Sequence, residues 1–150
     1  MCCRVRACPS LAAMCVVVRF PAAGLAGRPW WRMAVVRFAD LEDIPFLPVA
    51  GELYWVRTLI LWSGDKKPTR PVVVIEVPAT SLGRVSVVTR TTDIKRRGVR
   101  HEAMPEIGLT KCGVFADFRS AEATLWTPRN ARRLGILPST VFSQVLEQFW

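Results

Sequence analysis

The sequence predicts a small antiparallel β-barrel of the α+β class that ends in a single helix. From Gly51 onwards, short runs rich in β-branched and aromatic residues alternate with turns that contain glycine or proline. The apolar period changes from two to about 3.6 residues only near the end of the chain. Several short strands followed by one helix are typical of a small barrel with a helix packed against it.

The expected strands differ in their pattern. Residues 51–60 combine aromatic and β-branched side chains, whereas 71–77 are almost continuously apolar, as in a strand buried on both faces. Gly, Asp, Lys and Pro at 62–69 predict an exposed loop. The remaining expected elements are a strand at 84–92, a basic turn or short strand at 93–101, and one or two strands within 111–120 and 121–127.

A helix is expected after residue 138. Ser139 can cap it, and Leu137 stands just before that cap. Val141, Val145 and Phe149 then recur every four residues and form one apolar stripe. We interpret this stripe as core, and not as a groove for a partner.

The chain divides into three parts. Its 150 residues suffice for one domain with its own core, which we place at 51–150. Residues 33–50 contain two prolines and are expected to form an arm. Residues 1–32 are interpreted as an unstructured extension that precedes the true start at Met33. No apolar run reaches the ~20 residues that a membrane span needs.

Charge and cysteine content narrow the functional class. Lys and Arg total 21 against 12 Asp and Glu, giving a net charge of +9, which favours a polyanionic partner such as nucleic acid or an anionic membrane. Four of the five cysteines lie before position 16, so the body of the chain is interpreted as cytoplasmic and reduced. A single His without metal-ligand spacing argues against a zinc enzyme, and no cofactor is expected.

Three segments resemble one protein family in order and spacing. They are Gly-Glu-Leu-Tyr-Trp-Val at 51–56, Arg-Pro-Val-Val-Val-Ile at 70–75, and Gly-Val-Phe-Ala-Asp-Phe-Arg-Ser at 113–120. Arg-Leu-Gly at 133–135, followed by a helix, also fits. The chain is similar over these positions to the MazF/PemK (Kid) toxins of type II toxin–antitoxin systems. The resemblance implies an SH3-like barrel, a homodimer, an acidic antitoxin partner and ribosome-independent endoribonuclease activity (an mRNA interferase, a hydrolase of single-stranded RNA).

Arg70 is the main catalytic candidate. Cleaving RNA without a metal requires attack of a 2′-hydroxyl on the adjacent phosphorus, with charge stabilised on the phosphorane. A guanidinium remains charged near neutral pH and grips two phosphate oxygens at once. The resemblance gives the matching Arg a catalytic role. The alternative is that Arg70 lies at a strand edge and pairs with an acidic neighbour such as Asp65.

Two further catalytic candidates rest on the resemblance. Thr91 matches a Thr that the MazF branch places near the scissile phosphate, although Thr89 and Thr92 are nearby and Thr is common in strands. A slip of one residue in the strand would give the role to Thr92. Asp117 matches an Asp with an acid–base role in the PemK branch. The Arg expected two positions earlier is Phe115 here, so Asp117 is equally interpretable as a buried structural acceptor.

Other positions depart from the family pattern. The loop at 62–69 lacks the usual Glu-Gln pair, and Asp65 is its only acidic residue. Arg57 replaces an Asp, and Phe118 replaces a Gln. These departures predict altered specificity or a loss of activity.

A basic surface is expected to bind RNA through its phosphates, with Trp62 stacking an unpaired base. The alternative is a solvated charged loop with one exposed Trp. The residues assigned to this surface are Trp62, Lys66, Lys67, Arg90, Lys95, Arg96, Arg97, Arg100 and His101.

The sequence therefore favours a metal-independent endoribonuclease that leaves a 2′,3′-cyclic phosphate and a 5′-hydroxyl. Two rivals share the same barrel. One is a gyrase poison similar to the CcdB toxins, which act through C-terminal aromatic residues; this chain ends Phe149-Trp150. The other is an RNA-binding module that has lost its chemistry.

Overall fold

The computed structural model describes residues 41–150, and its compact unit comprises Ile44–Trp150. The expected extension at 1–32 and the first part of the arm lie outside the described residues. The described chain contains six strands, three 3-10 turns and an 11-residue α-helix. In chain order these are β1 (Glu52–Arg57), η1 (Thr58–Ile60), β2 (Thr69–Glu76), β3 (Arg84–Thr91), β4 (Val99–His101), η2 (Pro105–Ile107), β5 (Gly113–Glu122), η3 (Ala123–Leu125), β6 (Ala131–Ile136) and α2 (Ser139–Phe149).

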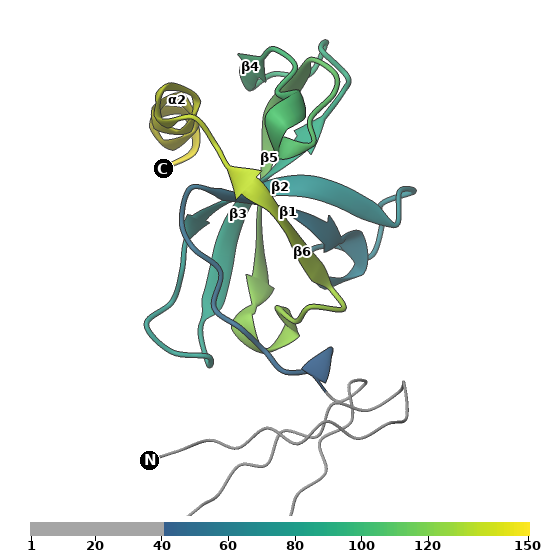
Figure 1. Ribbon diagram of the computed structural model, residues 1–150, viewed down its shortest axis with the longest axis vertical. Coiled ribbons are helices and arrows are strands. Elements are labelled where there is room, and N and C mark those ends of the chain that lie inside the picture. The colour runs from purple at the N-terminus through teal and green to yellow at the C-terminus, as the bar shows by residue number, and fades with distance from the viewer. Residues whose placement is uncertain (1–40) are drawn as a thin grey trace, which may run out of the picture. The chain divides into compact units, whose positions relative to one another are not determined.

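All strand pairs in the sheet are antiparallel, and the strand order is β4-β5-β3-β2-β1-β6. The sheet curls into a half-barrel, and α2 stands beside it near β4 (Figure 1). The predicted barrel with a C-terminal helix is therefore confirmed, with β4 and β6 as its two edge strands. None of the helices in residues 41–150 has the length and apolar character to cross a membrane.

Two apolar clusters cover the two faces of the sheet. Val72 and Val74 pack into the first cluster, and Val73 packs into the second. All three are fully buried, which confirms that this strand is covered on both faces. Trp126 is fully buried in the first cluster, as expected for core, whereas Trp55 is only partly buried and belongs to neither.

The helix closes the second cluster. Val145 is fully buried there, with Val141 and Phe149 packed around it, so the predicted apolar stripe is core. The predicted capping role of Ser139 is wrong. The helix begins at Ser139 itself, Pro138 occupies the cap position, and no side chain caps the first turn.

Strand boundaries differ from the prediction at both ends of the domain. The first strand stops at Arg57 because the chain enters the turn η1. Of the one or two strands expected within 111–127, the structure has one, β5, which runs across the expected boundary at 120. The edge strand β6 was not predicted. Its Arg132 and Arg133 are exposed, and Arg133 Nε donates to Glu52 Oε1 on β1 at 2.8 Å.

Candidate functional site

Charged side chains from four segments of the chain meet in one small cavity. Its volume is about 80 Å³, well below that of a pocket that encloses a whole ligand, so a larger ligand would lie along the surface with one group inside. We call it the arginine cavity. It is lined by Thr58, Leu61, Trp62, Asp65, Arg70, Thr89, Arg96, Asp117 and Arg119.

Strand register brings three of these residues to the same face. Val72 lies opposite Thr89, and Thr89 lies opposite Asp117, so Thr89 and Asp117 face the side of the first apolar cluster. Arg70, two residues before Val72, points to that side as well. The arginine cavity thus lies where the apolar side chains of the first cluster give way to polar ones.

A β-bulge at Ala116 aims Asp117 into the cavity. Thr89 pairs with Asp117, but the next residue on β3, Arg90, pairs with Phe115, so Ala116 is the extra residue of β5. The insertion reverses the alternation of side chains along the strand. Phe115 is therefore fully buried in the second cluster, on the opposite face from Asp117.

Arg70 is held by a bidentate pair with Asp65. Its Nε donates to Asp65 Oδ2, and its Nη2 donates to Oδ1 at 2.9 Å. The backbone N–H of Lys67 also donates to Oδ1 at 2.9 Å. The hydrogen bonds from Arg70 lower the pKa of Asp65 to about 2, and the same pairing raises the pKa of Arg70.

The Asp65 pair orients Arg70 without removing it from the cavity. The Asp65 side chain is 7% exposed and that of Arg70 is 22% exposed, so the guanidinium still reaches solvent. The ion pair with Asp65 that the sequence offered as the alternative is thus present, and the catalytic role of Arg70 stays a prediction.

A second guanidinium approaches Asp117 from the loop between β3 and β4. Arg96 Nη1 lies 3.2 Å and 3.4 Å from the two carboxylate oxygens of Asp117. Asp117 in turn contributes an attractive charge at Arg70. The cavity thus holds two Arg–Asp pairs side by side, and the cation missing at Phe115 is supplied by a different element.

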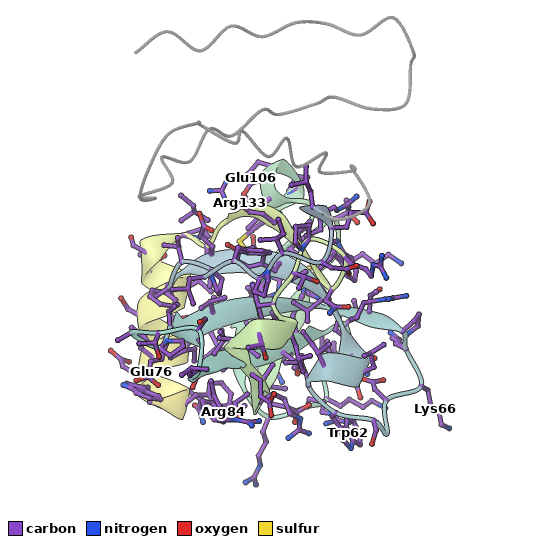
Figure 2. All side chains as sticks on the ribbon, turned by 90° about the horizontal axis from the view of Figure 1, so that it is seen from below. Trp62, Lys66, Glu76, Arg84, Glu106 and Arg133 are labelled. Carbon is purple, nitrogen blue, oxygen red and sulfur yellow. The ribbon has the colours of Figure 1, made fainter. Side chains whose placement is uncertain are left out.

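The third arginine of the cavity lies over an aromatic ring. The Arg119 guanidinium carbon is 5.2 Å from the centre of the Trp62 indole ring, within cation–π range. Trp62 is 51% exposed. Figure 2 shows Trp62 at the surface, on the side of the domain where Lys66 extends into solvent.

Thr91 lies outside the lining of the arginine cavity, whereas Thr89 on the same strand and Thr58 on η1 both line it. The Thr91 hydroxyl accepts a hydrogen bond from the backbone N–H of Asp93 at 3.2 Å. On β3 the hydroxyl that can reach a group in the cavity is therefore that of Thr89, which the sequence analysis did not select.

Two residues expected on the basic surface are buried elsewhere. Arg90 is 7% exposed and His101 is 8% exposed, and the Arg90 Nε donates to His101 Nε2 at 3.0 Å. Since Nε2 accepts, the ring proton lies on Nδ1 and donates to the carbonyl of Glu102. Burial lowers the pKa of both side chains. The expectation of an RNA-facing role for these two residues is thus corrected to a structural contact between β3 and β4.

The other predicted RNA-binding cations are exposed and lie outside the lining of the cavity. They are Lys66, Lys67, Lys95, Arg97 and Arg100. Arg119 was not predicted, although its spacing of two from Asp117 on a strand was a usable signal. No group of three or more His, Cys, Asp or Glu residues suited to a metal ion occurs in residues 41–150.

Among the solved structures similar to this chain are several from Deinococcus radiodurans. The chain matches no model of a known protein family and no curated protein sequence. A MazF crystal structure (Form-I) is 21% identical, with a TM-score of 0.51, over 68% of this chain and 92% of that one. Two MazE-MazF crystal structures, Form-II and Form-I, are 21% and 22% identical over 68% of this chain and 90% and 91% of theirs, with TM-scores of 0.49 and 0.48. The described part of this chain therefore has the fold of the MazF toxins.

Proposed function

We propose that the protein is a metal-independent endoribonuclease toxin that cleaves single-stranded RNA to a 2′,3′-cyclic phosphate and a 5′-hydroxyl. The observation that carries the proposal is Arg70, a guanidinium fixed by Asp65 and still open to the arginine cavity. A preorganised cation of this kind stabilises charge that develops on a phosphorane. The sequence resemblance implied both this fold and this chemistry, and the fold is present.

The reaction needs one bond made, one broken and one proton moved at each end. The 2′-oxygen attacks the phosphorus as its proton leaves, and the P–O5′ bond breaks as the 5′-oxygen gains a proton. Arg70 and Arg96 would bind the non-bridging oxygens, and Thr89 would donate to one of them. Asp117, once Arg96 turns towards the phosphate, is the carboxylate available for proton transfer.

The exposed cations would guide RNA to the cavity. Lys66 and Lys67 lie on the β1–β2 loop, and Lys95, Arg97 and Arg100 lie between β3 and the end of β4. Contacts of this kind with phosphates give a binding constant that falls steeply with salt. The phosphodiester chain would cross the cavity between these two groups.

The same charge distribution suits an acidic antitoxin as partner in the cytoplasm. MazE-MazF complexes are among the similar structures. An acidic segment over the exposed lysines and arginines would exclude RNA by occupying its binding surface. We further propose a homodimer, as the resemblance to MazF and PemK implies.

The proposal is tested with purified protein, a long unstructured RNA and EDTA. Wild type should cleave, leaving a terminal cyclic phosphate detected by mass spectrometry, and Arg70→Ala should not. Arg132→Ala is the matched control because Arg132 is exposed on β6, outside the cavity lining. Equal cleavage by wild type and Arg70→Ala, or no cleavage by wild type, would refute the proposed chemistry.

The rivals give different results in the same preparation. An RNA-binding module without chemistry would show salt-sensitive RNA binding and no turnover. A gyrase poison would inhibit DNA supercoiling and leave RNA intact, and of its two C-terminal aromatics Trp150 is exposed while Phe149 packs on the second cluster.

A further inference from the structure

We propose that Trp62 and Arg119 form a stacking subsite for one unpaired nucleobase, with a preference for purines, beside the phosphate position at Arg70. The inference rests on the proposed function and deepens it, because it names the part of the substrate that the chain reads. It is carried by the contact between the two side chains and by the place of both in the arginine cavity.

Trp62 presents an aromatic surface to solvent at a charged site. It is 51% exposed, whereas Trp126 in the first core cluster is completely buried. Three arginines, Arg70, Arg96 and Arg119, line the same cavity. A ligand that satisfies both features combines a flat ring with an anionic group, and a nucleotide has both.

Arg119 determines which side of the indole remains for the base. At 5.2 Å from the ring centre, its guanidinium already contacts the indole, so no ring fits between them. Its Nη1 also donates to the carbonyl of Phe118 at 3.2 Å, which anchors the side chain. The base therefore stacks on indole surface that Arg119 leaves free, with the cation behind the ring.

Gly64 helps to hold the indole in position. A Cβ at this residue would lie 2.8 Å from two carbons of the Trp62 ring and 2.9 Å from Nε1. Only glycine allows the loop to pass this close to the ring. The close approach of Gly64 and the contact with Arg119 thus limit where the indole can lie, which reduces the cost of ordering it on binding.

The purine preference follows from stacking area. No side-chain amide lines the cavity, and its hydroxyls and charges belong to the phosphate site, so recognition of the base depends on its face and not its edge. Larger rings stack more strongly, and stacking sites discriminate modestly on that basis. The subsite therefore accepts any base and binds adenine or guanine more tightly.

The test is RNA binding without cleavage. Fluorescence anisotropy measures the dissociation constants of 2′-O-methyl oligoadenylate, 2′-O-methyl oligouridylate and an abasic oligomer of equal length. The methyl group blocks the attacking 2′-oxygen, so binding is separated from turnover. Trp62→Ala should weaken oligoadenylate binding roughly 5- to 150-fold, oligouridylate less, and the abasic oligomer not at all.

Further variants test the geometry. Gly64→Ala should weaken oligoadenylate binding in the same direction, because the added Cβ displaces an indole that is still present. Arg119→Ala should cost about 2- to 5-fold more on oligoadenylate than on the abasic oligomer. Trp150→Ala is the matched control, an exposed tryptophan after α2 and outside the cavity, and should bind all three oligomers as wild type does.

The outcomes separate the subsite from the proposed function. If wild type binds and cleaves RNA but Trp62→Ala binds the three oligomers unchanged, or loses all three equally, the subsite is refuted and the nuclease stands. If wild type neither binds the oligomers nor cleaves RNA, the proposed function is refuted and the subsite with it.

Discussion

Replacing Asp65 by asparagine removes the negative charge beside Arg70 and preserves the size of the side chain. One carbonyl oxygen remains to accept a hydrogen bond, but the bidentate pairing of two guanidinium donors with two carboxylate oxygens is lost. Arg70 would then be a partly buried cation without its counterion. We expect both the stability of the domain and the orientation of Arg70 to suffer.

The pKa of Asp65 sets the size of the stability effect. It is lowered from 3.8 to about 2, which corresponds to at most about 2 to 3 kcal/mol at 1.36 kcal/mol per pKa unit. Because Arg70 is still partly open to solvent, we expect about 1 to 2 kcal/mol. A lowered carboxyl pKa stabilises the fold fully above pH 3.8, and this contribution is lost as the pH falls through about 2.

Urea denaturation of wild type and Asp65→Asn at a series of pH values measures this contribution. The two unfolding free energies should differ at pH 7 and converge between pH 4 and pH 2. RNA cleavage by the variant should fall about 10- to 100-fold, because a displaced guanidinium no longer meets the phosphorane. Equal stability at pH 7, or a difference that persists unchanged at pH 2, would show that the Asp65–Arg70 pair does not have the assigned role.

Three other predictions concern separate contacts. Arg96→Ala should slow cleavage by at least tenfold, whereas Arg97→Ala, at the exposed neighbouring residue, should alter only the salt dependence of RNA binding. Equal cleavage rates for wild type and Arg96→Ala in a single-turnover assay would remove Arg96 from the mechanism. His101 accepts a hydrogen bond from a buried guanidinium and has a lowered pKa, so wild type should lose stability as the pH falls below about 6.5, and His101→Gln should flatten that pH dependence in thermal denaturation. Burial and the hydrogen bond to Glu52 raise the pKa of Tyr54, the single tyrosine, to about 12; Glu52→Gln should lower it in an absorbance titration, and no change would assign the shift to burial alone.

The fold was predictable where the apolar period was clear. The valines of β2 and the four-residue repeat of α2 each specify one kind of element, and both were found. The edge strand β6 was missed because Arg132 and Arg133 give it no apolar alternation. An edge strand is hydrogen-bonded to a neighbour on one side only, so it tolerates exposed cations. Such charges also protect the open edge from pairing with the strand of another molecule.

The charged site was predictable in part. Arg70 and Asp117 were selected as candidates from motifs, but the residues that pair with them lie on other segments. Asp65, the partner of Arg70, lies in the β1–β2 loop, and Arg96, the partner of Asp117, lies in the β3–β4 loop. The local density of basic residues in the sequence also led to a wrong prediction of which cations are exposed. Arg90 and His101 belong to a basic stretch of sequence, yet they lie on the opposite side of the sheet from the cavity, where they hydrogen-bond each other.

The bulge at Ala116 explains why spacing alone could not place Asp117. Strict alternation from Phe115, a core residue, would turn Asp117 into the second cluster, where an unpaired carboxylate is costly. The extra residue reverses the direction of the side chains that follow, and no glycine or proline marks it in the sequence. The position of the carboxylate is therefore a property of the pairing between β3 and β5.

The distribution of charge separates affinity from catalysis in this domain. Inside the arginine cavity, two of the three guanidinium groups are paired with carboxylates, so the cavity carries little net charge. The excess positive charge lies on exposed side chains such as Lys66 and Lys95, where it attracts phosphates at long range. Replacing those lysines should therefore weaken RNA binding and reduce its salt dependence. Changes at Asp65 or Arg96 should instead lower the rate at which bound RNA is cleaved. A single set of residues that controlled both quantities would contradict this division.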